Sequence, residues 1–138
     1  VGRDFNTTRA GIHAGGLRYH GVAPLISRLV LDELVEPQAF DQLSCYGASV
    51  KWARTEGFVS TPETSHALAA VVAEAKKAKE EGKERVILFN WSGHGLMDLV
   101  GYEKYFQGDL DDYALPDEDL SRFTASMDDF PTPASVQT

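Results

Sequence analysis

The sequence predicts an α/β fold, with an open, mainly parallel sheet covered by helices. Segments with the three- and four-residue spacing of amphipathic helices alternate with short apolar runs. The run at residues 86–89 (VILF) is apolar at every position, which is typical of a strand buried on both faces. It ends at the glycine-rich turn NWSGHG of residues 90–95, and ligands bind at this position in α/β sheets. Because the predicted strands are few and short, we expect part of a larger domain.

The first helix is predicted over residues 22–34, where apolar residues recur at helical spacing and Pro24 lies in the first turn. Residues 35–40 contain a proline and are expected to be extended or a connector. A second helix follows, with Asp41 as its N-cap and Gly57 at its end.

A brief strand at residues 57–60 is predicted to lead into the longest helix. Thr61 fits the N-cap of this helix, and Pro62 fits the first helical position, which tolerates a missing N–H group. The apolar spacing continues until Gly82, the expected C-terminal stop, and three lysines lie near this end. These lysines are therefore read as a solvated helix end.

After the strand at residues 85–90, a helix is predicted over residues 96–106, with Gly108 ending it. A short helix that opens with acidic residues is predicted to end near Ala125. The chain thus divides into an irregular lead-in (1–11), a portion of an α/β domain (12–108), an acidic connector with a short helix (109–125) and a flexible tail (126–138).

Composition limits the classes of function. The chain has 138 residues and a net charge of −8, of which residues 109–138 carry −7 (eight acidic residues and one basic residue). No basic face is available for phosphate groups, so nucleic-acid binding is not expected. No apolar run approaches the roughly 20 residues needed to span a membrane. The single cysteine, Cys45, is expected to be a small buried hydrophobe and fits a reducing compartment such as the cytoplasm.

Three places could form a ligand site. The loop at residues 12–21 (IHAGGLRYHG) groups polar side chains around three glycines, although its histidines could be structural. Ser92 and the glycines after it could face a ligand or simply form a tight strand-to-helix turn with a serine cap. Glu63, in the first turn of the long helix, is explained by spacing alone as a carboxylate placed to complement the helix dipole.

Three motifs together identify a family. These are HAGGLRYHG at residues 13–21, EGFVSTPETSHA at 56–67 and NWSGHG at 90–95. In this order and spacing they closely resemble the carboxyl-terminal part of the tryptophan synthase beta chain, and most closely its second, "beta-like" branch. The resemblance covers about residues 11–120 and implies a fold-type II enzyme that uses pyridoxal 5′-phosphate. Such a lyase joins serine to indole in tryptophan biosynthesis.

The resemblance assigns roles to individual residues. Ser92 matches the serine whose hydroxyl binds the pyridine nitrogen of the cofactor, and Glu63 matches the glutamate beside cofactor and substrate. This second assignment replaces the helix-dipole interpretation of Glu63. Gly93 and Gly95 match glycines that shape the wall of the cofactor pocket. A neutral hydroxyl at the pyridine nitrogen suits β-elimination and replacement, because it leaves the nitrogen unprotonated.

The glycine-rich loop is implied to serve a cation and the substrate. The backbone carbonyls of Leu17, Tyr19 and Gly21 match the place where the family binds a monovalent cation, K⁺ or Na⁺. Arg18 stands where the better-known branch has an aspartate that handles the substrate hydroxyl. This reversed charge admits a phosphorylated serine as the donor, since guanidinium suits phosphate.

The lysine that binds the cofactor and the phosphate-binding loop belong to the upstream part of the family chain, and neither motif occurs here. We therefore expect the chain alone to be inactive. The expected partners are the missing amino-terminal segment, a second copy in a homodimer and an alpha-type subunit. Two other readings stay open, a non-catalytic interaction module with an exposed sheet edge and a domain that binds a phosphate ligand at a helix start near Thr61 or Ser92.

Overall fold

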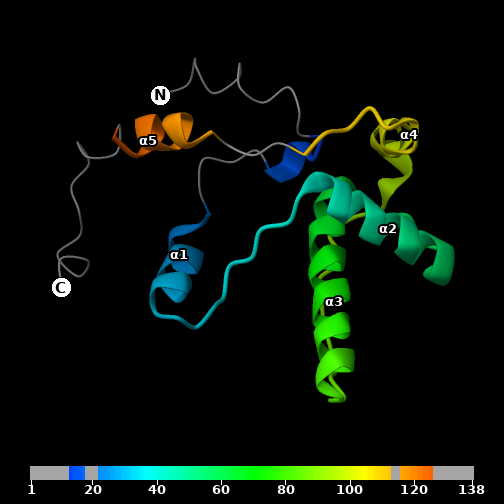
Figure 1. Ribbon diagram of the computed structural model, residues 1–138, viewed down its shortest axis with the longest axis horizontal. Helices are drawn as coiled ribbons and strands as arrows, with labels where there is room; N and C mark the ends of the chain where they lie inside the picture. The colour runs from blue at the N-terminus through cyan, green and yellow to red at the C-terminus, as the bar shows by residue number, and fades with distance from the viewer. Residues whose placement is uncertain (1–12, 18–21, 113–115, 126–138) are drawn as a thin grey trace.

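The computed structural model describes residues 13–17, 22–112 and 116–125, and these residues are helical or without regular structure. Figure 1 shows that the helices form a branched arrangement rather than layers on a sheet. In chain order the elements are the 3₁₀ turn η1 (Gly15–Leu17), α1 (Pro24–Leu31), α2 (Gln42–Glu56), α3 (Pro62–Glu81), the 3₁₀ turn η2 (Gly95–Met97), α4 (Leu99–Gln107) and α5 (Asp117–Ala125).

The core lies where α2, α3 and α4 meet. Tyr46 on α2 is 1% exposed and packs edge-on against Tyr102 of α4, with ring centroids 5.1 Å apart. Leu110 completes this cluster, and Leu68 on α3 is buried as well. Burial of these large side chains removes apolar surface from water and fixes the three helices relative to one another.

The helix ends follow the capping signals of the sequence. Thr61 caps α3, since its side chain accepts a hydrogen bond from the Thr64 N–H. Gly57 and Gly82 end α2 and α3 in the left-handed conformation, with φ values of 78° and 64°. Asp41 occupies the N-cap of α2, although its side chain makes no capping hydrogen bond. The predicted bounds of these two helices are therefore confirmed.

The remaining helices are also found, with two adjustments. The first helix, predicted over residues 22–34, is shorter and covers only Pro24–Leu31. The helix predicted over residues 96–106 is divided into η2 and α4, which ends at Gly108. The short acidic helix is α5, which ends at Ala125 as predicted. The first helix is α1, but none of its residues is buried, and Leu25 is 70% exposed. No helix among the described residues combines the length and the hydropathy required to cross a membrane.

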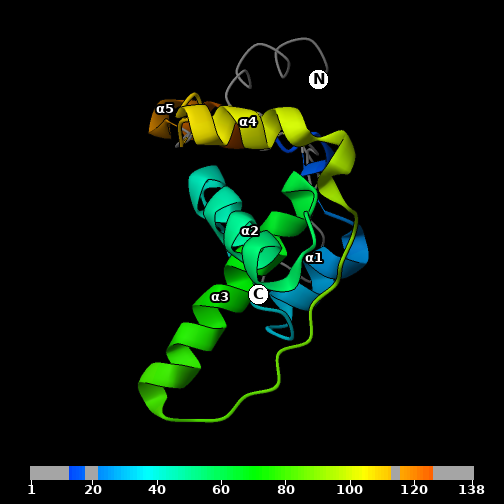
Figure 2. The same cartoon turned by 90° about the vertical axis from the view of Figure 1, so that its right-hand side faces the viewer.

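The predicted sheet is not formed by the described residues. Their only β-pairing is an isolated antiparallel bridge between Ser60 and His94. The segment expected to be a strand, residues 85–90, instead runs back from the end of α3 as an open trace (Figure 2). Val86 and Leu88 are 98% and 95% exposed rather than buried. A strand needs a neighbouring backbone for its N–H and C=O groups, and residues 85–90 make no backbone hydrogen bond to any other described residue. The contact of Phe89 with Trp52 of α2 is made by side chains.

Two parts of the predicted domain organisation cannot be compared with the structure. The lead-in at residues 1–11 and the tail at residues 126–138 lie outside the described residues.

Candidate active site

The three motifs of the sequence meet at the first turn of α3. The turn that carries Ser92 is fastened to the segment before α3 by two backbone hydrogen bonds. Thr61 donates its N–H to the carbonyl of Gly93 at 3.1 Å, and Gly95 donates its N–H to the carbonyl of Val59 at 2.8 Å. These bonds flank the Ser60–His94 bridge and hold residues 92–95 beside the helix start.

Both glycines of this turn are required by close contacts. A Cβ atom on Gly93 would lie 2.8 Å from Cγ2 of Thr61. A Cβ atom on Gly95 would overlap the backbone carbonyl oxygen of Ser60, which has no freedom to rotate away. The glycines therefore allow residues 92–95 to approach the start of α3 closely enough for side-chain contacts between the two segments.

Ser92 ends a row of three hydroxyl groups. Its Oγ lies 2.6 Å from Oγ1 of Thr64, which lies 3.0 Å from Oγ1 of Thr61. Thr64 is buried, with 2% of its surface exposed, whereas Ser92 is exposed. The Ser92 hydroxyl thus has one hydrogen-bond partner on the protein, and Ser92 as a residue is exposed to solvent.

Glu63 connects the first motif to the second. Its Oε1 accepts a hydrogen bond of 2.7 Å from the Gly16 N–H, in η1. A Cβ atom on Gly16 would lie 2.9 Å from Cγ and Oε1 of Glu63, so this glycine also permits a close approach. Glu63 remains in the first turn of α3, where a carboxylate complements the helix dipole. The structure thus places Glu63 next to the glycine-rich loop, on the same helix turn as the partner of Ser92.

Most of the predicted cation and substrate residues cannot be placed. Leu17 lies in η1, with its N–H donating to the Ala14 carbonyl at 3.3 Å. Arg18, Tyr19 and Gly21 lie outside the described residues. Within the described part of the chain, no group of three or more histidine, cysteine, aspartate or glutamate side chains could hold a metal ion.

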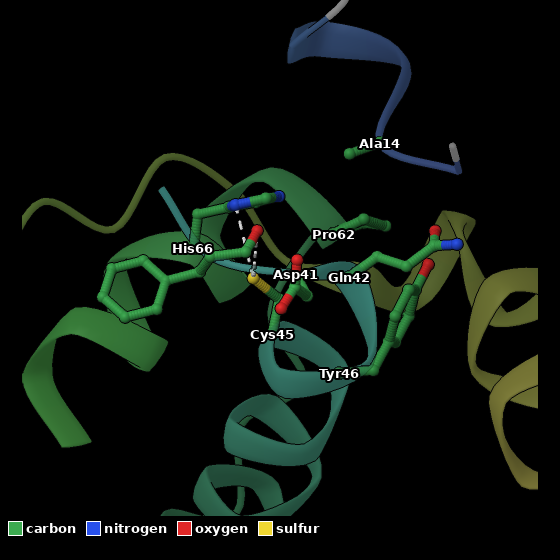
Figure 3. Close-up of a pocket in the computed structure, with 8 residues that line it drawn as sticks. Ala14, Asp41, Gln42, Cys45, Tyr46, Pro62 and His66 are labelled. Carbon is green, nitrogen blue, oxygen red and sulfur yellow. Dashed lines mark hydrogen bonds between the residues drawn. The ribbon is translucent and has the colours of Figure 1, made fainter. Parts of the chain in front are cut away.

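The sequence did not predict a cavity of about 110 Å³ between the starts of α2 and α3 (Figure 3). Cys45 and His66 line it, and Cys45 Sγ lies 3.3 Å from His66 Nδ1. Burial raises the pKa of the Cys45 thiol to about 12, and the nearby Asp41 and Asp112 carboxylates add to this. Burial lowers the pKa of His66, against an opposing effect of Glu63.

Cys45 is 1% exposed, so the predicted buried role is confirmed. His66 could have been predicted from the sequence by its position three residues after Glu63, because residues at this spacing are neighbours on the surface of a helix.

A second cluster that the sequence did not predict supports the site from behind. The Tyr102 hydroxyl, on α4, donates to the Ser60 carbonyl at 2.5 Å. The Ser49 hydroxyl, on α2, lies 2.5 Å from the Tyr102 hydroxyl and also contacts the Ser60 hydroxyl. Ser49 and Ser60 are fully buried. These contacts anchor the segment before α3 to two other helices, so the position of the Ser92 turn is set by the core.

Comparison with known proteins identifies relatives over most of the chain. The chain is 58% identical over 102 residues to the tryptophan synthase beta chain 2 of Thermotoga maritima, which is 74% of this chain and 24% of that protein. It is 55% identical over 102 residues, again 74% of this chain, to 23% of the tryptophan synthase beta chain of Thermococcus gammatolerans. It is 54% identical over 110 residues to the tryptophan synthase beta chain 2 of Pyrococcus furiosus, covering 80% of this chain and 25% of that protein.

The chain spans about a quarter of the length of these curated relatives, and it matches their carboxyl-terminal part. No protein-family model matches it. Over about three quarters of its length, the chain is therefore similar to the carboxyl-terminal part of the tryptophan synthase beta chain.

Proposed function

We propose that this chain forms one wall of the pyridoxal-phosphate site of a lyase that joins L-serine, or a related donor, to indole to give L-tryptophan. One observation carries the proposal. Ser92 Oγ lies 2.6 Å from Oγ1 of the buried Thr64, and Ser92 itself is an exposed residue. The names of the relatives support the same reaction class.

The residues present fit one side of the cofactor. Bound pyridoxal phosphate supplies an electron sink for β-elimination and replacement at the amino acid. Ser92 would donate a hydrogen bond from its hydroxyl to the pyridine nitrogen, and this neutral donor would leave the nitrogen unprotonated. Gly93 and Gly95 lack side chains on the turn that carries Ser92, and the fixed close approach of that turn to α3 would keep the hydroxyl in place.

Glu63 would act beside the cofactor and the substrate. One of its carboxylate oxygens is held at 2.7 Å by the Gly16 N–H, which orients the group. The other oxygen would accept a proton from the reacting amino acid or hold a donor group of it. The link to Gly16 makes the glycine-rich loop part of the same wall.

The rest of the site is proposed to come from the upstream part of the enzyme. That part would carry the lysine that binds the cofactor and the phosphate-binding loop, so this chain alone would be inactive. The exposed side chains of Val86 and Leu88 support a neighbouring strand from that part. We further propose a cytoplasmic homodimer that works with an alpha-type subunit. Carbonyls of Leu17, Tyr19 and Gly21 would hold K⁺ or Na⁺, and Arg18 would contact the amino-acid donor.

The test is Ser92→Ala in the complete protein, meaning this chain together with the upstream part. We expect pyridoxal phosphate to bind up to about tenfold more weakly, because one hydrogen bond is lost, and the absorbance spectrum of the bound cofactor to change. Ser44→Ala, at an exposed serine of α2, is the matched control and should change neither. Unchanged affinity and spectrum in Ser92→Ala would reject the proposed role of Ser92.

A further inference from the structure

Thr64 is the buried member of the hydroxyl row that ends at Ser92. Its Oγ1 lies 3.0 Å from Thr61 Oγ1 and 2.6 Å from Ser92 Oγ, and the residue is 2% exposed. A hydroxyl so enclosed cannot exchange either partner for bulk water, so both contacts must be hydrogen bonds. Because a hydroxyl carries a single proton, Thr64 can donate to at most one of these neighbours, and the other contact is one in which it accepts.

The direction of this row decides what Ser92 can offer. If Thr64 donates to Ser92, then Ser92 accepts on its protein side and keeps its own proton for a ligand. If Ser92 donates to Thr64 instead, its proton is used inside the protein, and it can only accept from a ligand. The two directions therefore select ligand atoms of opposite kinds, an acceptor in the first case and a donor in the second.

The cap of α3 favours the first direction. Thr61 Oγ1 accepts the backbone N–H of Thr64 at 3.2 Å, and a backbone N–H can only donate. A hydroxyl oxygen that already accepts a hydrogen bond is a stronger donor through its own proton, because bonds in a row polarise one another. This effect favours a row in which Thr61 donates to Thr64, Thr64 donates to Ser92, and Ser92 donates outward.

We propose that Thr64 is a positioning residue that turns Ser92 into a hydrogen-bond donor toward its ligand. The inference rests on the proposed function, in which the ligand atom is the unprotonated pyridine nitrogen of pyridoxal phosphate. Thr64 itself does not touch the cofactor in this arrangement. By making Ser92 a donor, Thr64 favours the unprotonated pyridine nitrogen, which accepts a hydrogen bond, over the protonated nitrogen, which would donate one.

The experiment compares Thr64→Val with Thr64→Ser in the complete protein. Valine keeps the branched shape and removes the hydroxyl, whereas serine keeps the hydroxyl. Thr55→Val, at an exposed threonine of α2, is the matched control. The readouts are the dissociation constant of pyridoxal phosphate, measured by adding it to the apo-protein, and the absorbance of the bound cofactor as a function of pH.

We expect Thr64→Val to raise the dissociation constant about fivefold, the effect of weakening one hydrogen bond, and to shift the pH at which the spectrum changes. Thr64→Ser should restore both quantities to within about twofold of the unmodified protein. Where the valine variant does not fold, Thr64→Ala carries the same expectation.

The outcomes separate this inference from the proposed function. If Thr64→Val binds pyridoxal phosphate like the unmodified protein while Ser92→Ala binds it more weakly, the role of Thr64 is overturned and that of Ser92 stands. Equal losses in Thr64→Val and Thr64→Ser would show that Thr64 acts through packing, which also overturns the inference. If Ser92→Ala leaves both the affinity for pyridoxal phosphate and the spectrum unchanged, the proposed role of Ser92 and this inference are rejected together.

Discussion

At the scale of single residues, burial sets the protonation of the groups that line the cavity beside α3. Cys45 Sγ and His66 Nδ1 are 3.3 Å apart, a distance at which a thiol and an imidazole can share a proton. Burial raises the pKa of Cys45 to about 12 and lowers the pKa of His66, so both groups are neutral at pH 7. The charged thiolate–imidazolium pair that would make a nucleophile is therefore disfavoured.

The lowered pKa of His66 predicts a pH-dependent stability. Below about pH 6.5 the unfolded chain takes up a proton on this histidine that the folded chain does not, so folding becomes less favourable as the pH falls. Above that pH His66 is neutral in both the folded and the unfolded chain, so its protonation no longer lowers the stability of the folded state. The slope is at most about 1.4 kcal/mol per pH unit, and less here because His66 is only partly buried.

The measurement is the midpoint of urea unfolding of the complete protein and of His66→Gln between pH 5 and pH 8. We expect the stability of the unmodified protein to fall relative to that of His66→Gln as the pH decreases. A constant difference across this range would contradict the assignment.

At the scale of elements, the turn that carries Ser92 is held in place by a close backbone approach. Two hydrogen bonds and the Ser60–His94 bridge join it to the segment before α3. Ser60 is held in turn by the Tyr102 hydroxyl, so α4 contributes to the position of Ser92 without touching it. The glycine at position 95 leaves the space that this approach requires.

Gly95→Ala is therefore expected to destabilise the protein. The added Cβ would overlap the Ser60 carbonyl, and relief requires a shift of the backbone at an expected cost of about 1–3 kcal/mol. Gly15→Ala is the matched control, because a Cβ there meets no atom within 4 Å. Urea unfolding of both variants of the complete protein gives the two free-energy changes. Equal changes would show that the contact at Gly95 carries no strain.

At the scale of the whole molecule, α2, α3 and α4 share a core, whereas other apolar surfaces face outward. Val86 and Leu88 are almost fully exposed, and α1 has no buried residue. Residues 85–91 form no backbone hydrogen bond within the described part of the chain. This arrangement is expected of a portion of a domain whose covering elements are supplied by a further segment.

Hydrogen exchange tests this arrangement. In the isolated chain, the amides of residues 85–90 should exchange rapidly because they lack partners. In the complete protein a neighbouring strand should protect them at least about tenfold, which corresponds to roughly 1.4 kcal/mol. The amides of α3 serve as an internal reference for folding in both samples. Equal exchange of residues 85–90 in the two samples would contradict the proposed strand.

The sequence predicted those features that neighbouring residues decide. Capping depends on a few adjacent positions, so the sequence predicts the start of α3 at Thr61 and the ends of α2 and α3 at Gly57 and Gly82. The strand at residues 85–90 was not found in the structure because a strand depends on distant backbone groups. Likewise, no local pattern places Thr64 against Ser92, which is 28 positions away along the chain.

The candidate site could be predicted only through the resemblance to a family. Spacing explains Glu63 as a helix-dipole residue and Ser92 as a turn residue, and neither pattern shows that they lie on adjoining segments. The contact between Glu63 and Gly16 joins positions 47 apart. His66 was overlooked for the same reason, since its partner Cys45 lies on a different helix.

The aromatic contacts beside Ser92 have an optical consequence. Trp91 and Trp52 are the two tryptophans of the chain, and their ring centroids are 6.1 Å apart. Phe89 and Phe58 pack against Trp91 as well. Indoles at this separation exchange excitation energy, so they emit as a coupled pair rather than as two independent reporters. Because Trp91 directly precedes Ser92, the intrinsic fluorescence of this chain originates next to the candidate site and will respond, without any added label, to whatever displaces that turn.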